Sequence, residues 1–136
     1  MGDPCGNIIE EAVNPYAFII LENEIRDTAK ETFGYFASQG VDIVVISGDN
    51  PVTASKVAVR AGINNAENYI DATTLKSRQD IREAITKYTV FGRVVPSQKK
   101  EIIEAYKESG KVVAMTGDGV NDVLALKCAD CSVAMA

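Results

Sequence analysis

Short apolar runs of strand length alternate along this chain with helical patterns. The run VDIVVI (41–46) shows almost no alternation of apolar and polar residues, which is typical of a strand covered on both faces. Strand patterns lie at 16–23, 41–46, 69–70, 89–94, 111–116 and 131–136, and helical patterns at 24–40, 51–62, 79–88, 96–109 and 120–129. This order predicts an α/β fold, a Rossmann-like three-layer arrangement in which helices cover both faces of a parallel sheet.

Polar residues stand at the ends of two of these strand patterns. SGDN (47–50) follows the strand at 41–46, and TGDG (116–119) ends the strand at 111–116. Ligands of open parallel sheets bind beyond the carboxyl ends of the strands. A serine hydroxyl there can donate to an anion, together with the next backbone N–H groups and the positive potential of a helix start. The alternative is a capping turn, in which Asp49 or Asn50 caps the next helix without any ligand.

Two lysines occupy an unfavourable position at the start of the helix expected at 96–109. Lys99 and Lys100 lie in its first turn, where the helix dipole disfavours a cation. A bound anion, or a cluster of acids that the lysine neutralises, would explain such a residue. The alternative, which is the better explanation for either lysine taken alone, is a solvated charge on the helix surface. Arg93 fits either a ligand contact or a surface ion pair.

The stretch TGDGVND (116–122) places Asp118, Asn121 and Asp122 within five positions. Its two glycines allow a sharp turn and a close approach of the backbone to a ligand. Oxygen ligands at this density suit a hard cation, and Mg²⁺ uses one or two carboxylates together with a phosphate and several waters. Helix capping explains one acid and the amide but does not explain all three groups. The sequence therefore predicts a Mg²⁺ site at this turn.

The composition argues against several classes of protein. The chain has 136 residues, of which 46% are hydrophobic, and this is enough for one domain with a core. A net charge of −5 argues against a nucleic-acid partner, because clustered Lys and Arg bind the phosphate backbone. No apolar run approaches the roughly 20 residues that cross a bilayer, and no signal peptide is evident. We therefore expect a soluble, cytosolic chain. For the C-x-x-C of Cys128 and Cys131, the alternatives are a redox pair, half of a zinc site or, as we favour, two small thiols that are buried or half-buried.

Three stretches, in this order, resemble one known family. SGDNPVTASKVAVRAGI (47–63), FGRVVPSQKKEIIEA (91–105) and VVAMTGDGVNDVLALKCADCSVAMA (112–136) are similar to the second part of the phosphorylation domain of P-type cation-transporting ATPases. Those enzymes belong to the haloacid dehalogenase-like superfamily. The resemblance covers residues 16–136 and leaves 1–15 as an irregular N-terminal segment. Its SGDNPVT stretch resembles bacterial members more than the animal calcium and sodium pumps.

The resemblance implies a role for each residue of the predicted sites. It implies a phosphate-binding set of Ser47, Gly48, Asp49, Lys99 and Asn121. It implies that Asp118 and Asp122 hold Mg²⁺, and that Lys99 and Asp122 are the catalytic residues. Arg93 matches the arginine that precedes the lysine motif, and the other matched positions are Thr116, Gly117 and Gly119.

The family's nucleophile, the Asp of a D-K-T-G-T motif, does not occur in this sequence. In the family that Asp accepts the γ-phosphoryl group of ATP, and its strand lies in the middle of the sheet. The resemblance therefore implies a partial phosphorylation domain, a fragment that is inactive alone. The implied partners are the missing nucleophile strand and the nucleotide-binding and membrane domains of a parent pump. The phosphorylation domain of such a pump lies on the cytoplasmic side of the cell membrane.

Loss of a central strand would leave the strands at 41–46 and 111–116 with unpaired edges, which proteins normally avoid. We expect these strands to pair directly, or another segment or molecule to fill the gap, including a second copy of the chain. Two other functions fit the same residues. One is a free-standing, non-catalytic module that binds phosphate and Mg²⁺, and the other is a small phosphatase of the same superfamily.

Overall fold

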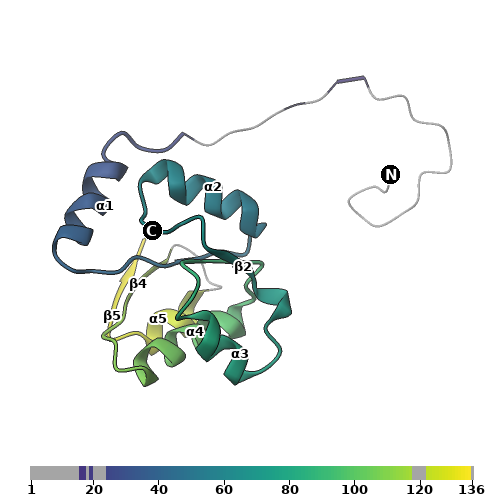
Figure 1. Cartoon of the computed structure of the whole chain (residues 1–136), viewed down its shortest axis with the longest axis vertical. Helices are drawn as coiled ribbons and strands as arrows, with labels where there is room; N and C mark the ends of the chain where they lie inside the picture. Colours follow the sequence, from purple (N-terminus) through teal and green to yellow (C-terminus); the bar gives the residue numbers. More distant parts are fainter. Residues whose placement is uncertain (1–15, 18, 20–23, 118–121, 136) are drawn as a thin grey trace.

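The computed structural model describes residues 16, 17, 19, 24–117 and 122–135 (Figure 1). Within this part of the chain, strands and helices alternate from residue 45 onward, as the sequence predicts. Tyr16, Ala17 and Ile19 lie in no strand, so the strand predicted at 16–23 is not seen at its described residues. The elements are α1 (Ala29–Ser38), β1 (Val45–Ile46), α2 (Pro51–Ala61), β2 (Tyr69–Asp71), the 3₁₀ helix η1 (Ala72–Thr74), α3 (Arg78–Ala84), β3 (Val90–Gly92), α4 (Pro96–Glu108), β4 (Ala114–Gly117), α5 (Val123–Cys128) and β5 (Cys131–Ala134).

The described strands form two separate parallel sheets. The first has the order β1-β3-β2, and the second consists of β4 and β5. In the first sheet Asp71 lies opposite Gly92, and in the second Ala114 lies opposite Cys131. A helix stands in the connection from each strand to the next within these sheets, as parallel pairing requires. The predicted class, parallel strands alternating with helices, is therefore confirmed.

β3 is the centre of the hydrophobic core because helices cover both of its faces. Val90 packs with Ala54 and Ala58 of α2, whereas Phe91 packs with residues of α3 and α4, including Ile102. Both Val90 and Phe91 are completely buried. Successive side chains of a strand point to opposite faces, so this short strand contributes to both layers of the core.

The start of α2 lies directly against β3. The Asn50 side chain accepts a hydrogen bond from the Val52 N–H and so caps the helix, which begins at Pro51. A Cβ atom on Gly92 would lie 2.3 Å from the Cα of Pro51, so only glycine permits this approach of β3 to the helix. The alternative of a capping turn after the strand at 41–46 is therefore confirmed for Asn50.

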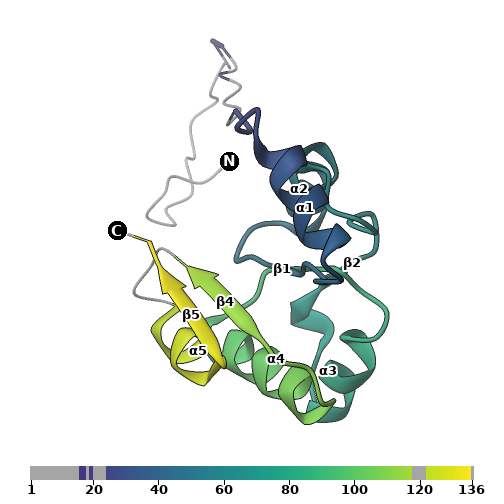
Figure 2. The ribbon, with the colours of Figure 1, turned by 90° about the vertical axis from the view of Figure 1, so that its left-hand side faces the viewer.

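β1 and β4 each have a partner on only one edge within the described part of the chain (Figure 2). Direct pairing of these two strands, the first alternative expected from the sequence, is therefore wrong for this structure. No described strand lies between them. β1 has two residues and β4 has four, whereas the sequence patterns predict six for each. Filling of the gap by another molecule stays a prediction.

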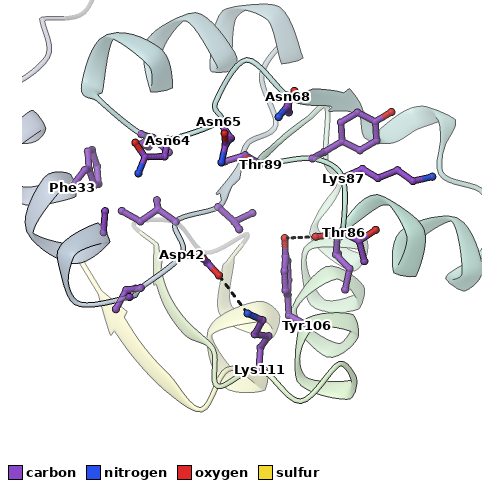
Figure 3. A pocket seen from close by; sticks show the side chains of 18 of the residues that line it. Phe33, Asp42, Asn64, Asn65, Asn68, Thr86, Lys87, Thr89, Tyr106 and Lys111 are labelled. Atoms are coloured by element: carbon purple, nitrogen blue, oxygen red, sulfur yellow. Dashed lines mark hydrogen bonds and ion pairs between the residues drawn. The ribbon is translucent and has the colours of Figure 1, made fainter.

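A cavity of about 760 Å³ opens beside the segments that lead into β1 and β4 (Figure 3). Asp42, before β1, and Lys111, before β4, form an ion pair of 3.4 Å, which shows that the two segments enter side by side. Tyr106 of α4 also lines the cavity, and its hydroxyl donates to the carbonyl of Ile85 at 3.4 Å. Burial, with a smaller effect of the Asp42 charge, raises the pKa of Tyr106 to about 12.

α1 contacts α2 but buries none of its residues. Phe36, which the sequence pattern places on the apolar face of this helix, is 42% exposed. The apolar face of α1 therefore has no complete cover within the described part of the chain. None of the helices in that part combines the length and the apolar character needed to cross a membrane.

Candidate functional site

The first group of predicted site residues forms the turn after β1. The Ser47 N–H donates to the carbonyl of Phe91 at 2.9 Å, which anchors the turn to β3. The Ser47 hydroxyl accepts from the Asp49 N–H at 3.1 Å and donates to the Asp49 carboxylate at 3.2 Å. Gly48 and Asp49 are exposed. The turn therefore lies at the carboxyl end of the strand, where ligands of parallel sheets bind, with the Gly48 backbone exposed and the half-buried Ser47 hydroxyl bonded to Asp49.

Arg93 joins this turn through its backbone and joins β2 through its side chain. Its N–H donates to the Asp49 carbonyl at 2.7 Å, and its Nη1 donates to Asp71 Oδ2 at 2.9 Å. Asp71 also accepts from both the N–H and the hydroxyl of Thr73. The Thr73 hydroxyl and N–H, and then Arg93, lower the pKa of Asp71. The alternative of an ion pair is therefore the one observed for Arg93.

The second group is a buried ion pair between α4 and the start of α5. Lys99 Nζ donates to Asp122 Oδ1 at 2.5 Å, and the two side chains are only 14% and 11% exposed. Lys99 lies in the first turn of α4, where the helix dipole disfavours a positive charge. The carboxylate of Asp122 compensates for this effect. Lys100 instead pairs with Glu104 at 3.4 Å and is 48% exposed, as expected of a lysine on a solvated helix surface.

Gly117 at the end of β4 allows Asp122 to approach the strand. A Cβ atom on Gly117 would lie 2.8 Å from Asp122 Oδ2 and 2.9 Å from Asp122 Cβ. Contacts this short would displace Asp122, so the glycine that the sequence singled out has a steric role. Thr116, the preceding residue, is exposed and lies opposite Val133 of β5.

The structure thus assembles the predicted site in two groups. Both lie at carboxyl ends of parallel strands, one after β1 and the other after β4. Among the described residues, no hydrogen bond or ion pair joins the Ser47 turn directly to Lys99 or Asp122. The connection runs through the chain instead: the Val94 N–H donates to the Ser47 carbonyl at 3.0 Å, and α4 begins two residues later. Asp118, Gly119 and Asn121 lie outside the described residues.

A divalent cation needs more oxygen ligands than the described residues offer. Nowhere in the described ranges do three Asp, Glu, His or Cys side chains come together in a group that could hold a metal. Asp122 is the one predicted metal ligand that the structure describes, and the Lys99 ammonium already contacts its Oδ1. A cation does not fit beside that ammonium without further anionic ligands. The described residues alone therefore do not form a Mg²⁺ site.

Asp71 lies at the carboxyl edge of the first sheet, as the Ser47 turn does, and the sequence pattern did not identify it as a site residue. The sequence pattern ends the short strand at Ile70, but the structure extends β2 by one residue, and Asp71 stands at its carboxyl end. An Asp at a strand end, followed two residues later by Thr73, is a signal for a side-chain-capped turn and could have identified it. The ion pair of Asp71 with Arg93 could not be predicted from local sequence, because it depends on the register of β2 against β3.

Comparison with known proteins defines the class to which this site belongs. A family model described as haloacid dehalogenase-like hydrolase matches residues 5–130. The chain therefore belongs to the haloacid dehalogenase-like hydrolase family, as its resemblance implies. The predicted fold class is confirmed by the same match and by a solved structure, described as the catalytic domain of the CPx-ATPase CopB-B. That structure has a TM-score of 0.58 and 28% identity, over 80% of this chain and 34% of its own.

Within this family the chain is similar to P-type cation pumps. It is 49% identical over 124 residues to the calcium-transporting ATPase CtpE of Mycobacterium tuberculosis, which covers 90% of this chain and 15% of that protein. It is 44% identical to a probable cation-transporting ATPase, exp7, of Streptococcus pneumoniae, over 91% of this chain and 16% of that protein. A human relative, calcium-transporting ATPase type 2C member 1, is 40% identical over 116 residues. The chain thus spans about one sixth or less of the length of these relatives.

Proposed function

We propose that this chain is part of the phosphorylation domain of a P-type cation-transporting ATPase and is completed by a strand from elsewhere in the parent protein. The observation that carries the proposal is the position of the two site groups. The Ser47 turn follows β1 and the Lys99–Asp122 pair lies beside the end of β4, and each of these strands has an edge without a partner in the described part of the chain. β2 and β5 are edge strands as well, but only β1 and β4 have the predicted site residues at their carboxyl ends. A strand inserted between them would bring its own carboxyl end to the same edge of the sheet.

Each group has a defined role in this proposal. The Ser47 hydroxyl and the Asp49 N–H leave the hydrogen bonds that they make to each other's residue and, with the Gly48 N–H, bind phosphoryl oxygens, assisted by Asn121. The Lys99 ammonium neutralises negative charge on the phosphoryl oxygens. It has three N–H donors and uses one of them for Asp122, so two remain for the phosphoryl group. Mg²⁺ would be held by Asp118 and Asp122 together with a carboxylate of the inserted strand. Bound there, the ion would neutralise negative charge on the phosphate.

The reaction requires the nucleophile of the inserted strand. An aspartate oxygen forms a bond to the γ-phosphorus of ATP while the bond from phosphorus to ADP breaks, and ADP leaves. This chain supplies charge and positioning but not the attacking oxygen, so alone it turns over no phosphate. Cation transport, the nucleotide-binding and membrane domains, and a place on the cytoplasmic side of the membrane belong to the proposed parent pump.

Strand complementation tests the proposal. The chain is mixed with a synthetic peptide that carries an apolar strand ending in D-K-T-G-T, and Mg²⁺ binding is measured by calorimetry in the presence of inorganic phosphate. We expect weak Mg²⁺ binding by the chain alone and at least about tenfold tighter binding with the peptide, because a second carboxylate completes the ligand set. A peptide with N-K-T-G-T is the matched control and should give a smaller gain.

Three results would contradict the proposal. The first is a Kd for Mg²⁺ that the peptide does not change, and the second is binding that survives Asp118→Asn. The third is release of phosphate from p-nitrophenyl phosphate by the chain alone, if this is lost on substitution of one of its own aspartates. That result would favour a small phosphatase of the same family instead.

A further inference from the structure

Arg93 has an unusual backbone conformation for its residue type. Its φ is +53°, in the left-handed region, and Asn65 is the one other non-glycine residue with a positive φ that the structure records in the described ranges. Asparagine enters this region readily, whereas a long side chain such as arginine does so at a cost. Arg93 must therefore be held in place by its surroundings.

The left-handed conformation directs two successive N–H groups onto the Ser47 turn. The Arg93 N–H donates to the Asp49 carbonyl at 2.7 Å, and the Val94 N–H donates to the Ser47 carbonyl at 3.0 Å. These bonds connect the loop between β3 and α4 with the turn after β1. They fix the carbonyl groups of Ser47 and Asp49, and so they define the path of the backbone through Gly48.

Asp71 is placed to hold Arg93 in this conformation. It lies opposite Gly92 in the pairing of β2 with β3, so its backbone is fixed one position from Arg93. Two hydrogen bonds from Thr73 orient its carboxylate, which accepts from Arg93 Nη1 at 2.9 Å. The side chains of Arg93 and Asp71 are 52% and 26% exposed. A surface ion pair contributes little by itself, but here it selects one backbone conformation over another.

We propose that Asp71 and Arg93 are a positioning pair. Asp71 holds Arg93 in the left-handed conformation, and the Arg93 and Val94 N–H groups then keep the Ser47–Asp49 turn in the shape that receives a phosphoryl group. In this arrangement the Arg93 guanidinium acts on Asp71 and does not bind the ligand. That the ligand is a phosphoryl group rests on the proposed function, whereas the hydrogen bonds between the two loops do not.

Alanine and glycine at position 93 distinguish a positioning residue from a ligand-binding one. Both substitutions remove the guanidinium, but only glycine adopts a positive φ without strain. In the ¹⁵N-labelled chain, amide hydrogen exchange at positions 93 and 94 reports the two bonds to the turn. A titration with inorganic phosphate, followed at the Gly48 and Asp49 amides, reports the ligand. Arg82→Ala is the matched control, because it removes a similarly exposed arginine from a surface ion pair, with Glu108, that does not include the turn.

For Arg93→Ala we expect roughly tenfold faster exchange at both amides and roughly tenfold weaker phosphate binding, the size of the left-handed penalty for a residue with a Cβ. For Arg93→Gly both quantities should stay within about twofold of the unsubstituted chain. Asp71→Asn should fall between them, and it should have no further effect when combined with Arg93→Gly. Arg82→Ala should change neither quantity.

Two outcomes would overturn the positioning pair. One is an Arg93→Gly chain as impaired in phosphate binding as Arg93→Ala, which would mean that the guanidinium binds the ligand. The other is unchanged exchange at positions 93 and 94 in Arg93→Ala. If the unsubstituted chain does not respond to phosphate while the exchange pattern follows expectation, the positioning pair stands and the proposed phosphoryl ligand is wrong.

Discussion

β3 and β4 come from similar sequences but have different environments. TVFGRV (89–94) and KVVAMT (111–116) are both short apolar runs of the kind expected in the middle of a parallel sheet. All three residues of β3 are buried, whereas exposed and half-buried residues alternate along β4, and Val112 just before it is 88% exposed. β3 has strands on both edges, and β4 has one partner in the described part of the chain. An apolar pattern thus indicates the environment that a segment needs, and its neighbours decide whether it has that environment.

The largest difference between the two strands should come from removing one apolar side chain from each. Phe91→Ala in β3 should lower the free energy of unfolding by about 3–5 kcal/mol, because a fully buried ring is replaced by a cavity. Met115→Ala in β4 should cost less than about 1.5 kcal/mol, because Met115 is only half-buried and the strand can relax around it. Urea denaturation followed by circular dichroism measures both. Equal losses of unfolding free energy would show that β4 is as tightly packed as β3, which would contradict the difference in environment between the two strands.

The buried ion pair of the second site group should give the next largest effect. Lys99→Met leaves the Asp122 carboxylate without its partner at 11% exposure, and we expect a loss of about 2–4 kcal/mol in the free energy of unfolding. Asp122→Asn should cost less, because the long lysine side chain can extend to solvent. Combining the two changes should cost less than Lys99→Met alone, since no buried charge then remains. A double variant whose loss equals the sum of the single losses would contradict a direct pairing.

Local signals in the sequence were enough for much of the fold and for part of the site. Pro51 and Gly62 mark the ends of α2, as the structure shows, because each residue has a backbone preference that suits a helix end. For Lys99 taken alone a solvated charge is the better explanation from the sequence, and this is wrong; the alternative of a nearby acid is the one observed, and Asp122 is that acid. Such signals depend only on neighbours along the chain or on the helix dipole.

Features that depend on pairing between distant segments could not be predicted in this way. Arg93 and Asp71 are 22 positions apart, and only the register of β2 with β3 brings them together. The separation of the five described strands into two sheets likewise depends on which strands pair, and the sequence patterns do not specify that. For Asp118 and Asn121, which lie outside the described residues, the predicted roles stay predictions.

The smallest effect concerns a carboxylate that joins α4 to the β4–β5 sheet. Asp130 accepts from the Val113 N–H at 2.9 Å and pairs with Lys107 at 2.9 Å. The Val113 N–H, and then Lys107, lower the pKa of Asp130 below its ordinary value of 3.8. A carboxylate with a lowered pKa in the folded state stabilises that state above its ordinary pKa, and this stabilisation is lost as the pH falls through the lowered value. Asp71 plays the corresponding part beside β3, where Thr73 and Arg93 lower its pKa.

Asp130→Asn should therefore destabilise the chain at pH 7, and its difference from the unsubstituted chain should shrink as the pH falls below about 4. The asparagine keeps an oxygen that can accept from Val113, so the difference measures the charge and not the loss of an acceptor. Urea denaturation at a series of pH values gives this difference. Glu101→Gln, which removes an exposed carboxylate from α4, is the control and should show a small difference at every pH. A difference in unfolding free energy for Asp130→Asn that persists unchanged to pH 2 would mean that the Asp130 charge does not stabilise the contact of α4 with the β4–β5 sheet. β4 would then depend only on its pairing with β5 and its packing against α5.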